Sequence, residues 1–154
     1  MPANNIKNQS IHALPQDREL CACTTLRGLA RRATAIYDGV LEPVGLKQTQ
    51  YSVLARLDRL VHCSLGELAE ICDLDVTSLS RGLRPLIANG WVKSGPGKDD
   101  RTKRYELTAQ GKQGVRKAFA LWKKAQSRLH EVIAPEDIQA LESLSGLLKG
   151  AYLG

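Results

Sequence analysis

Five polar side chains within residues 77–84 carry the hydrogen-bonding groups that bind phosphates and nucleobases. They are Thr77, Ser78, Ser80, Arg81 and Arg84. At helical spacing they lie opposite the aliphatic residues Leu79, Leu83 and Ile87, which are expected to hold such a helix against a core. An arginine can donate two hydrogen bonds to one guanine, which is worth about 1–3 kcal/mol of discrimination between bases. The pattern predicts a helix face that contacts double-stranded DNA; the alternative is an ordinary solvated helix face.

A second group of cations follows in a segment rich in turn residues. Trp91–Lys93 and Tyr105–Leu107 are predicted to be strands on either side of a turn at Gly95–Asp100. The cations near this turn are Lys98, Arg101 and Lys103. We expect them to contact the sugar-phosphate backbone or the adjacent minor groove, and Asp99 to hold the Arg101 guanidinium extended through a charge-assisted bond. The alternative is an exposed loop of mixed charge.

Two short helices joined by a tight turn are predicted to position the polar face. Ser64 and Glu67 form a capping-box pattern, which predicts a helix over residues 64–72. Asp75 can cap a second helix, which Asn89-Gly90 would end. Pro85 lies inside that second helix and is expected to bend it without ending it, because the apolar stripe continues beyond the proline.

Longer amphipathic helices flank this helix-turn-helix. One is predicted from Pro15 to about residue 41, and another from about Lys47 to Val61. Thr108 is a plausible cap for a helix of about six turns, and Pro135 opens a last helix. Because the outer helices carry more apolar surface than the central segment can cover, we expect them to pack against a second copy of the chain in a symmetric dimer.

Length and composition favour one domain preceded by an arm. The 154 residues are 43% hydrophobic, and the arm is predicted at 1–14, the domain at 15–154. No apolar stretch has the length of a membrane span or the character of a signal peptide, so we expect a cytoplasmic protein. The net charge of +6 is concentrated between residues 76 and 104, where seven Lys and Arg residues accompany two Asp residues. This distribution favours an anionic partner.

The order of these elements resembles the MarR family of winged helix-turn-helix transcriptional regulators. The resemblance rests on Asp99-Asp100-Arg101 followed by Leu107-Thr108 and Gly111, and on the segment from Asp75 to Val92. The family usually has Arg at the position of Asp100. The resemblance covers about residues 17–150 and implies a mainly α fold with long N- and C-terminal dimerisation helices and a two-stranded β-wing. The dimerisation helices would lie at 15–46 and 109–154, and the winged helix-turn-helix at 47–108.

The resemblance also implies a homodimer that binds a pseudo-palindromic DNA operator. Such a protein is usually a repressor released by a small molecule or an oxidant. Phenolic compounds and aromatic carboxylates are common effectors in the family, and Arg27 and Arg31 are candidates to line an effector cleft. Two helix-turn-helix units must lie about 34 Å apart to enter successive major grooves, so an effector that favours another spacing would weaken binding.

The cysteines suggest alternative triggers. Cys23 and Tyr37 are similar in spacing to the sensing cysteine and a tyrosine of the organic-hydroperoxide branch of the MarR family, although Gln48 replaces a second tyrosine. The simpler interpretation is that Cys23 packs as a small apolar residue. Glu19–Cys23 is also similar to the metalloid-binding motif of ArsR-type repressors, but no partner ligands accompany it, and we expect no metal site.

Other classes of function remain as alternatives. One is a winged-helix module that binds protein and not DNA, and another is a thiol peroxidase that uses Cys23 as its nucleophile. The sequence contains no phosphate-binding glycine loop, zinc-protease helix or nucleophile elbow. We therefore expect neither an enzyme nor a bound cofactor.

Overall fold

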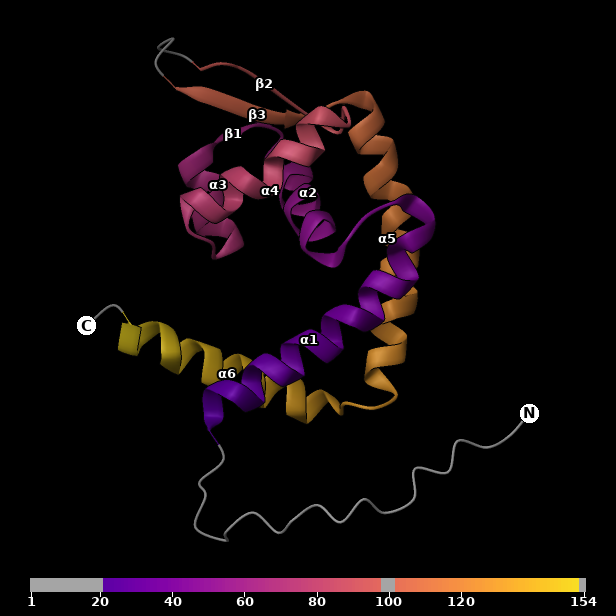
Figure 1. Cartoon of the computed structure of the whole chain (residues 1–154), viewed down its shortest axis with the longest axis vertical. Coiled ribbons are helices and arrows are strands. Elements are labelled where there is room, and N and C mark those ends of the chain that lie inside the picture. Colours follow the sequence, from indigo (N-terminus) through magenta and orange to yellow (C-terminus); the bar gives the residue numbers. More distant parts are fainter. Residues whose placement is uncertain (1–20, 98–101, 153–154) are drawn as a thin grey trace, which may run out of the picture. The chain divides into compact units, whose positions relative to one another are not determined.

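The computed structural model describes residues 21–97 and 102–152, and its elements are mostly helical (Figure 1). In chain order they are α1 (Ala22–Leu41), the 3-10 helix η1 (Glu42–Val44), α2 (Gln48–Leu60), β1 (Cys63–Ser64), α3 (Leu65–Cys72), α4 (Val76–Ala88), β2 (Val92–Pro96), β3 (Lys103–Leu107), α5 (Ala109–His130) and α6 (Pro135–Tyr152). The chain divides into two compact units, and the boundary between them lies inside α1, between residues 32 and 33. The expected helix start at Pro15 and the arm at 1–14 lie outside the described residues.

Proline, glycine and capping residues near the helix ends predicted where most helices begin and end. Pro43 lies in η1, which follows α1 directly, and Gly45 has a positive φ of 67° that suits a residue without a side chain. Thr108 caps α5 as predicted, because its side-chain oxygen accepts a hydrogen bond from the Gly111 backbone N–H at 2.9 Å. The long helix predicted from Thr108 ends at His130.

The helix-turn-helix consists of α3 and α4, which pack against each other and against α2 (Figure 1). The capping box is confirmed: the Glu67 N–H donates to Ser64 Oγ at 3.3 Å, and the Ser64 N–H donates to Glu67 Oε2 at 2.7 Å. Asp73 ends α3 in the left-handed region, with φ of 55°, and so makes the tight turn. The second helix, α4, continues through Pro85 to Ala88.

The sheet has three strands in the order β1-β3-β2, all antiparallel. The sequence predicted only the hairpin of β2 and β3, which forms the wing. It missed β1, whose two residues pair with Tyr105 and Arg104 of β3. The first wing strand begins one residue later than predicted, at Val92, and extends to Pro96, so part of the predicted turn belongs to the strand.

A close contact joins the base of the wing to α5. The Thr108 hydroxyl donates to the Gly90 carbonyl at 2.6 Å, and the Thr108 N–H donates to the Trp91 carbonyl at 3.1 Å. A Cβ at Gly111 would lie 2.0 Å from that Trp91 oxygen, and a Cβ at Gly114 would lie 2.0 Å from the Trp91 ring. Glycine is therefore required at both positions for α5 to approach Trp91.

The core is mainly aliphatic and gathers residues from α2 to α5 together with the last residues of α1. The side chains that are at most 1% exposed include Leu41, Leu54, Leu57, Leu68, Leu79, Leu83 and Leu86. The predicted inward orientation of Ile87 is wrong, because that side chain is 38% exposed. In α6, no side chain from 135 to 151 is buried within the described chain.

Candidate nucleic-acid interface

The outer face of α4 carries most of the predicted polar residues. Thr77, Ser78, Arg81 and Arg84 are exposed, whereas Leu79, Leu83 and Leu86 on the inner side are 1% exposed each. Ser80 differs from the expectation, because it is half-buried at the edge of this face. Neither Arg81 nor Arg84 forms an ion pair with another described residue. Both guanidinium groups are therefore available to an anionic partner.

The first turn of α4 is fixed by its cap. Asp75 Oδ1 accepts a hydrogen bond from the Ser78 backbone N–H at 2.8 Å. Hydrogen bonds from the Ser78 side chain and backbone hold the pKa of Asp75 below its usual value. The carboxylate thus remains charged at neutral pH and satisfies an N–H that would otherwise lack a partner at the helix start. This bond orders the turn that presents Thr77 and Ser78.

The described part of the wing contains three cations, and two of them, Lys103 and Lys93, are exposed in different environments. Lys103 is exposed, as a phosphate contact requires. Lys93 is also exposed, but its Nζ lies 2.8 Å from Glu106 Oε1 across the hairpin, and a hydrogen bond from Lys93 lowers the pKa of Glu106. Lys98 and Arg101, which were predicted to contact the DNA backbone, lie outside the described residues. Asp99, which was predicted to hold the Arg101 guanidinium, lies outside them as well.

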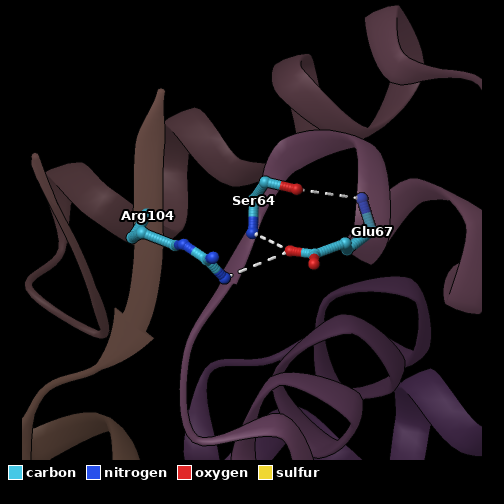
Figure 2. A network of polar contacts seen from close by, with 3 residues as sticks. All are labelled: Ser64, Glu67 and Arg104. Atoms are coloured by element: carbon cyan, nitrogen blue, oxygen red, sulfur yellow. Dashed lines mark hydrogen bonds and ion pairs between the residues drawn. The ribbon is translucent and has the colours of Figure 1, made fainter. Parts of the chain in front are cut away.

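Arg104 is a wing residue that entered the sequence analysis only as one of the positive charges between residues 76 and 104. Its side chain is 31% exposed, and its Nη1 lies 3.3 Å from Glu67 Oε2 on α3. Figure 2 shows this oxygen between the Arg104 guanidinium and the Ser64 backbone nitrogen. The hydrogen bond from Ser64 is the main reason that the pKa of Glu67 lies below its usual value, and Arg104 lowers the pKa further. The pairing of β1 with β3, which the sequence did not predict, brings these residues together.

A cavity of about 770 Å³ lies beside α2 and α5. Its lining includes the aromatic residues Tyr51, Phe119 and Trp122 and the cations Arg56, Arg59 and Arg116. Gln48 also lines it, and the Oε1 atom of this side chain is buried with no hydrogen-bond partner among the described residues. The surface therefore combines flat apolar contacts with positive charge. Arg27 and Arg31, the predicted cleft residues, are exposed on α1.

The cysteines occupy different environments. Cys21 and Cys23 are exposed at the start of α1, Cys72 is half-buried, and Cys63 is buried. Hydrogen bonds from the Thr24 hydroxyl and backbone lower the pKa of the Cys21 thiol, whereas burial raises the pKa of Cys63 and Cys72. Sequence reasoning favoured Cys23 and missed this contact of Cys21 with Thr24.

Tyr37, the predicted companion of Cys23, is buried, and its hydroxyl donates a hydrogen bond to Gln126 Oε1. Burial also raises the pKa of this tyrosine. Its hydroxyl therefore already has a partner within the chain.

Comparison with known proteins identifies the family. A model of the MarR family matches residues 46–103. The transcriptional regulator MosR of M. tuberculosis, in a crystal structure of its complex with DNA, is 34% identical to this chain with a TM-score of 0.77. That match covers 86% of this chain and 98% of the MosR chain. The chain belongs to the MarR family. The resemblance inferred from the wing and the segment after Asp75 is confirmed.

Two other similarities agree with this assignment to the MarR family. The uncharacterised HTH-type regulator YwoH of Bacillus subtilis (strain 168) is 28% identical over 104 residues, which are 68% of this chain and 76% of YwoH. A mutant MarR of E. coli, crystallised with operator DNA, has a TM-score of 0.73 at 20% identity, covering 82% of this chain and 91% of that one. The latter supports the winged helix-turn-helix fold, which is confirmed. No helix in the described part of this chain has both the length and the apolar character of a membrane span.

Proposed function

We propose that this chain is a homodimeric repressor that binds a pseudo-palindromic DNA operator. The observation that carries the proposal is the outer face of α4, where exposed Arg81 and Arg84 lie opposite a fully buried row of leucines. A helix held in this way can enter the major groove without losing its own core contacts. Thr77, Ser78 and Ser80 would contact phosphates or base edges, and the wing cations would contact the backbone, with Lys98, Arg101 and Lys103 as the predicted residues.

The relatives support this proposal. MosR at 34% identity was crystallised in complex with DNA, and E. coli MarR was crystallised with operator DNA. The exposed apolar side chains of α6 support the homodimer. Leu144, Leu147 and Leu148 are 50%, 71% and 58% exposed in the single chain, and a second copy would cover them.

The test is to select bound duplexes from a random pool and then titrate the selected operator against salt. Several displaced counterions should make the affinity fall steeply with salt concentration. Arg81→Ala should lower operator affinity about 5-fold to 150-fold and relax the preference at one base pair, as expected for the loss of a bidentate contact. Arg128→Ala, at an exposed arginine in the last turn of α5, is the matched control and should change the affinity little. Equal affinity for operator and random duplex would contradict the proposal.

The cavity beside α2 and α5 supports an aromatic anion as the effector that releases the DNA. Trp122 and Phe119 are stacked with centroids 6.0 Å apart, which provides a flat surface for a ring. Arg59 and Arg116 lie in no ion pair with another described residue, whereas Arg56 already donates to the Ile71 carbonyl at 3.1 Å. Gln48 Oε1 has no partner among the described residues, which favours a ligand that also donates a hydrogen bond, such as a phenol.

Salicylate and the non-aromatic cyclohexanecarboxylate are suitable probes for this effector site. Salicylate should bind the protein and lower its operator affinity, and the saturated acid should bind at least about 10-fold more weakly. Gln48→Leu removes the acceptor at similar volume and should weaken salicylate binding by about 10-fold while leaving operator affinity unchanged. Arg27→Gln and Arg31→Gln test the residues predicted from the sequence. Equal binding of both acids, measured by calorimetry, would contradict an aromatic site.

The exposed thiols at the start of α1 favour an oxidant as a second candidate trigger. A Cys23 or Cys21 thiolate would attack the O–O bond of an organic hydroperoxide, forming a sulfenic acid and releasing the alcohol. One equivalent of peroxide per chain should then release the operator, and Cys23→Ser or Cys21→Ser should prevent it. Several turnovers per chain would indicate a peroxidase instead. Release that persists in both serine variants would exclude these thiols.

A further inference from the structure

The Arg104 contact ties the wing to the helix-turn-helix at a point away from the base of the hairpin. At its base, the hairpin is fixed through Gly90, Trp91 and Thr108. Arg104 precedes Leu107, the last residue of β3, by three positions, which is about 10 Å of strand. Its contact with Glu67 reaches the first turn of α3, and α3 packs against α4. Together with the pairing of β1 with Tyr105 and Arg104, the ion pair therefore links the outer half of the wing to the body that presents Arg81.

We propose that Arg104 and Glu67 act together as positioning residues that hold the wing in its DNA-binding orientation, and that Arg104 does not bind phosphate. This inference rests on the proposed DNA-binding function. Its basis is the difference between adjacent residues of β3: Lys103 is exposed, whereas the half-buried Arg104 directs its guanidinium to a carboxylate. A cation already paired with a carboxylate gains less from a phosphate, because it must first give up that partner.

Glu67 has two separable roles, and this makes the proposal testable. Its Oε2 atom accepts from the Ser64 backbone N–H at 2.7 Å and from Arg104 at 3.3 Å. Glutamine at this position can still complete a capping box, because its amide oxygen accepts the same backbone bond. Glu67→Gln therefore removes the charge that holds Arg104 while it preserves the start of α3.

The experiment measures operator affinity at several salt concentrations for Glu67→Gln, Arg104→Gln and the double variant. Each single variant should bind about 3-fold to 10-fold more weakly than the wild type, and the double variant should bind no more weakly than either single one, because both remove the same contact. The slope of log affinity against log salt should not change. Lys103→Gln should instead reduce that slope by about 0.9, the value for one lost phosphate contact.

Glu106→Gln is the matched control. It removes an ion pair of the same type, with Lys93, but one that lies inside the hairpin and does not reach α3. Its operator affinity should stay within about twofold of the wild type. A reduced salt slope in Arg104→Gln, together with an unchanged affinity in Glu67→Gln, would show that Arg104 binds phosphate and would overturn the proposal. Additive losses in the double variant would overturn it as well.

Hydrogen exchange in the free protein separates this inference from the proposed function. Backbone amides of β3 should exchange about fivefold faster in Glu67→Gln and Arg104→Gln than in the wild type, and at an unchanged rate in Glu106→Gln. If the wild type binds no operator, the proposed function fails, but the exchange rates still decide whether the pair holds the wing. Unchanged exchange in both variants would overturn the positioning role.

Discussion

Helices α4 and α6 both carry leucines at helical spacing, yet the two sets of leucines have opposite environments. Leu79, Leu83 and Leu86 of α4 are 1% exposed each, whereas Leu147 of α6 is 71% exposed. The leucines of α4 pack toward α2, α3 and the first wing strand. Those of α6 have no comparable cover within the described chain. The difference indicates that the helix-turn-helix completes its core within one chain, whereas α6 needs a surface from elsewhere.

This comparison separates two origins of stability. Burial of a leucine in α4 stabilises the single chain by about 1.5–3 kcal/mol. Burial of a leucine in α6 by a second copy would stabilise only the dimer, so its contribution would depend on protein concentration. Matched substitutions in the two helices therefore test whether the regions differ as described.

The largest expected effect is that of Leu83→Ala in α4. The side chain is 1% exposed, so the substitution leaves a cavity in the core and should reduce the free energy of unfolding by about 2–5 kcal/mol. Urea denaturation followed by circular dichroism measures this change. Leu147→Ala in α6 is the matched control and should change the unfolding of the monomer by less than about 0.5 kcal/mol. Similar losses in both variants would contradict the comparison.

A smaller effect is expected from a charge in α6. Leu147→Asp leaves the single chain intact, because the position is 71% exposed, but it would place an unpaired carboxylate in the proposed dimer interface. The dimer dissociation constant should rise by about 10-fold to 100-fold, equivalent to about 1.4–2.8 kcal/mol. Sedimentation equilibrium measures this constant, and helical content serves as the folding control. An unchanged constant would mean that α6 lies outside the interface.

The smallest expected effect concerns the cap of α4. Hydrogen bonds from Ser78 lower the pKa of Asp75 in the folded state below its unfolded value, near 3.8. The ionised Asp75 therefore stabilises the fold at pH values above 3.8, and this stabilisation is lost as the pH falls through the lower folded pKa. Asp75→Asn keeps an acceptor at the cap without the titration. The variant should match the wild type in melting temperature near pH 7 and lose less stability between about pH 4 and pH 2. Parallel thermal melts across this range provide the measurement, and identical acid dependence in both proteins would refute the role of Asp75.

Local patterns predicted the helix-turn-helix and its polar face well. The capping box at Ser64, the cap at Asp75 and the end of α4 depend on residues within a few positions of one another, so their types and spacing contain the necessary information. The exposed positions of Arg81 and Arg84 follow from the same helical period. The wing hairpin was predicted for a similar reason, since turn residues lie between its strands.

The predictions that failed or were absent depend on segments distant in sequence. The two-residue strand β1 has no periodic signal of its own and exists through its pairing with β3 about 40 residues later. Arg104 was therefore counted only as charge, although it contacts Glu67. The half-burial of Ser80 and the exposure of Ile87 likewise depend on how far the neighbouring elements extend over α4.

The amino-acid order alone determined the helices, their caps and the concentration of positive charge on the helix-turn-helix, because these features arise from interactions between residues less than about two helical turns apart. Only the tertiary structure decided which cations remain available. It left Arg81 without an ion-pair partner among the described residues and placed Arg104 beside Glu67. The reason is that ion pairs and burial require atoms to meet in space, and the packing of α3 against the sheet brings these two residues together.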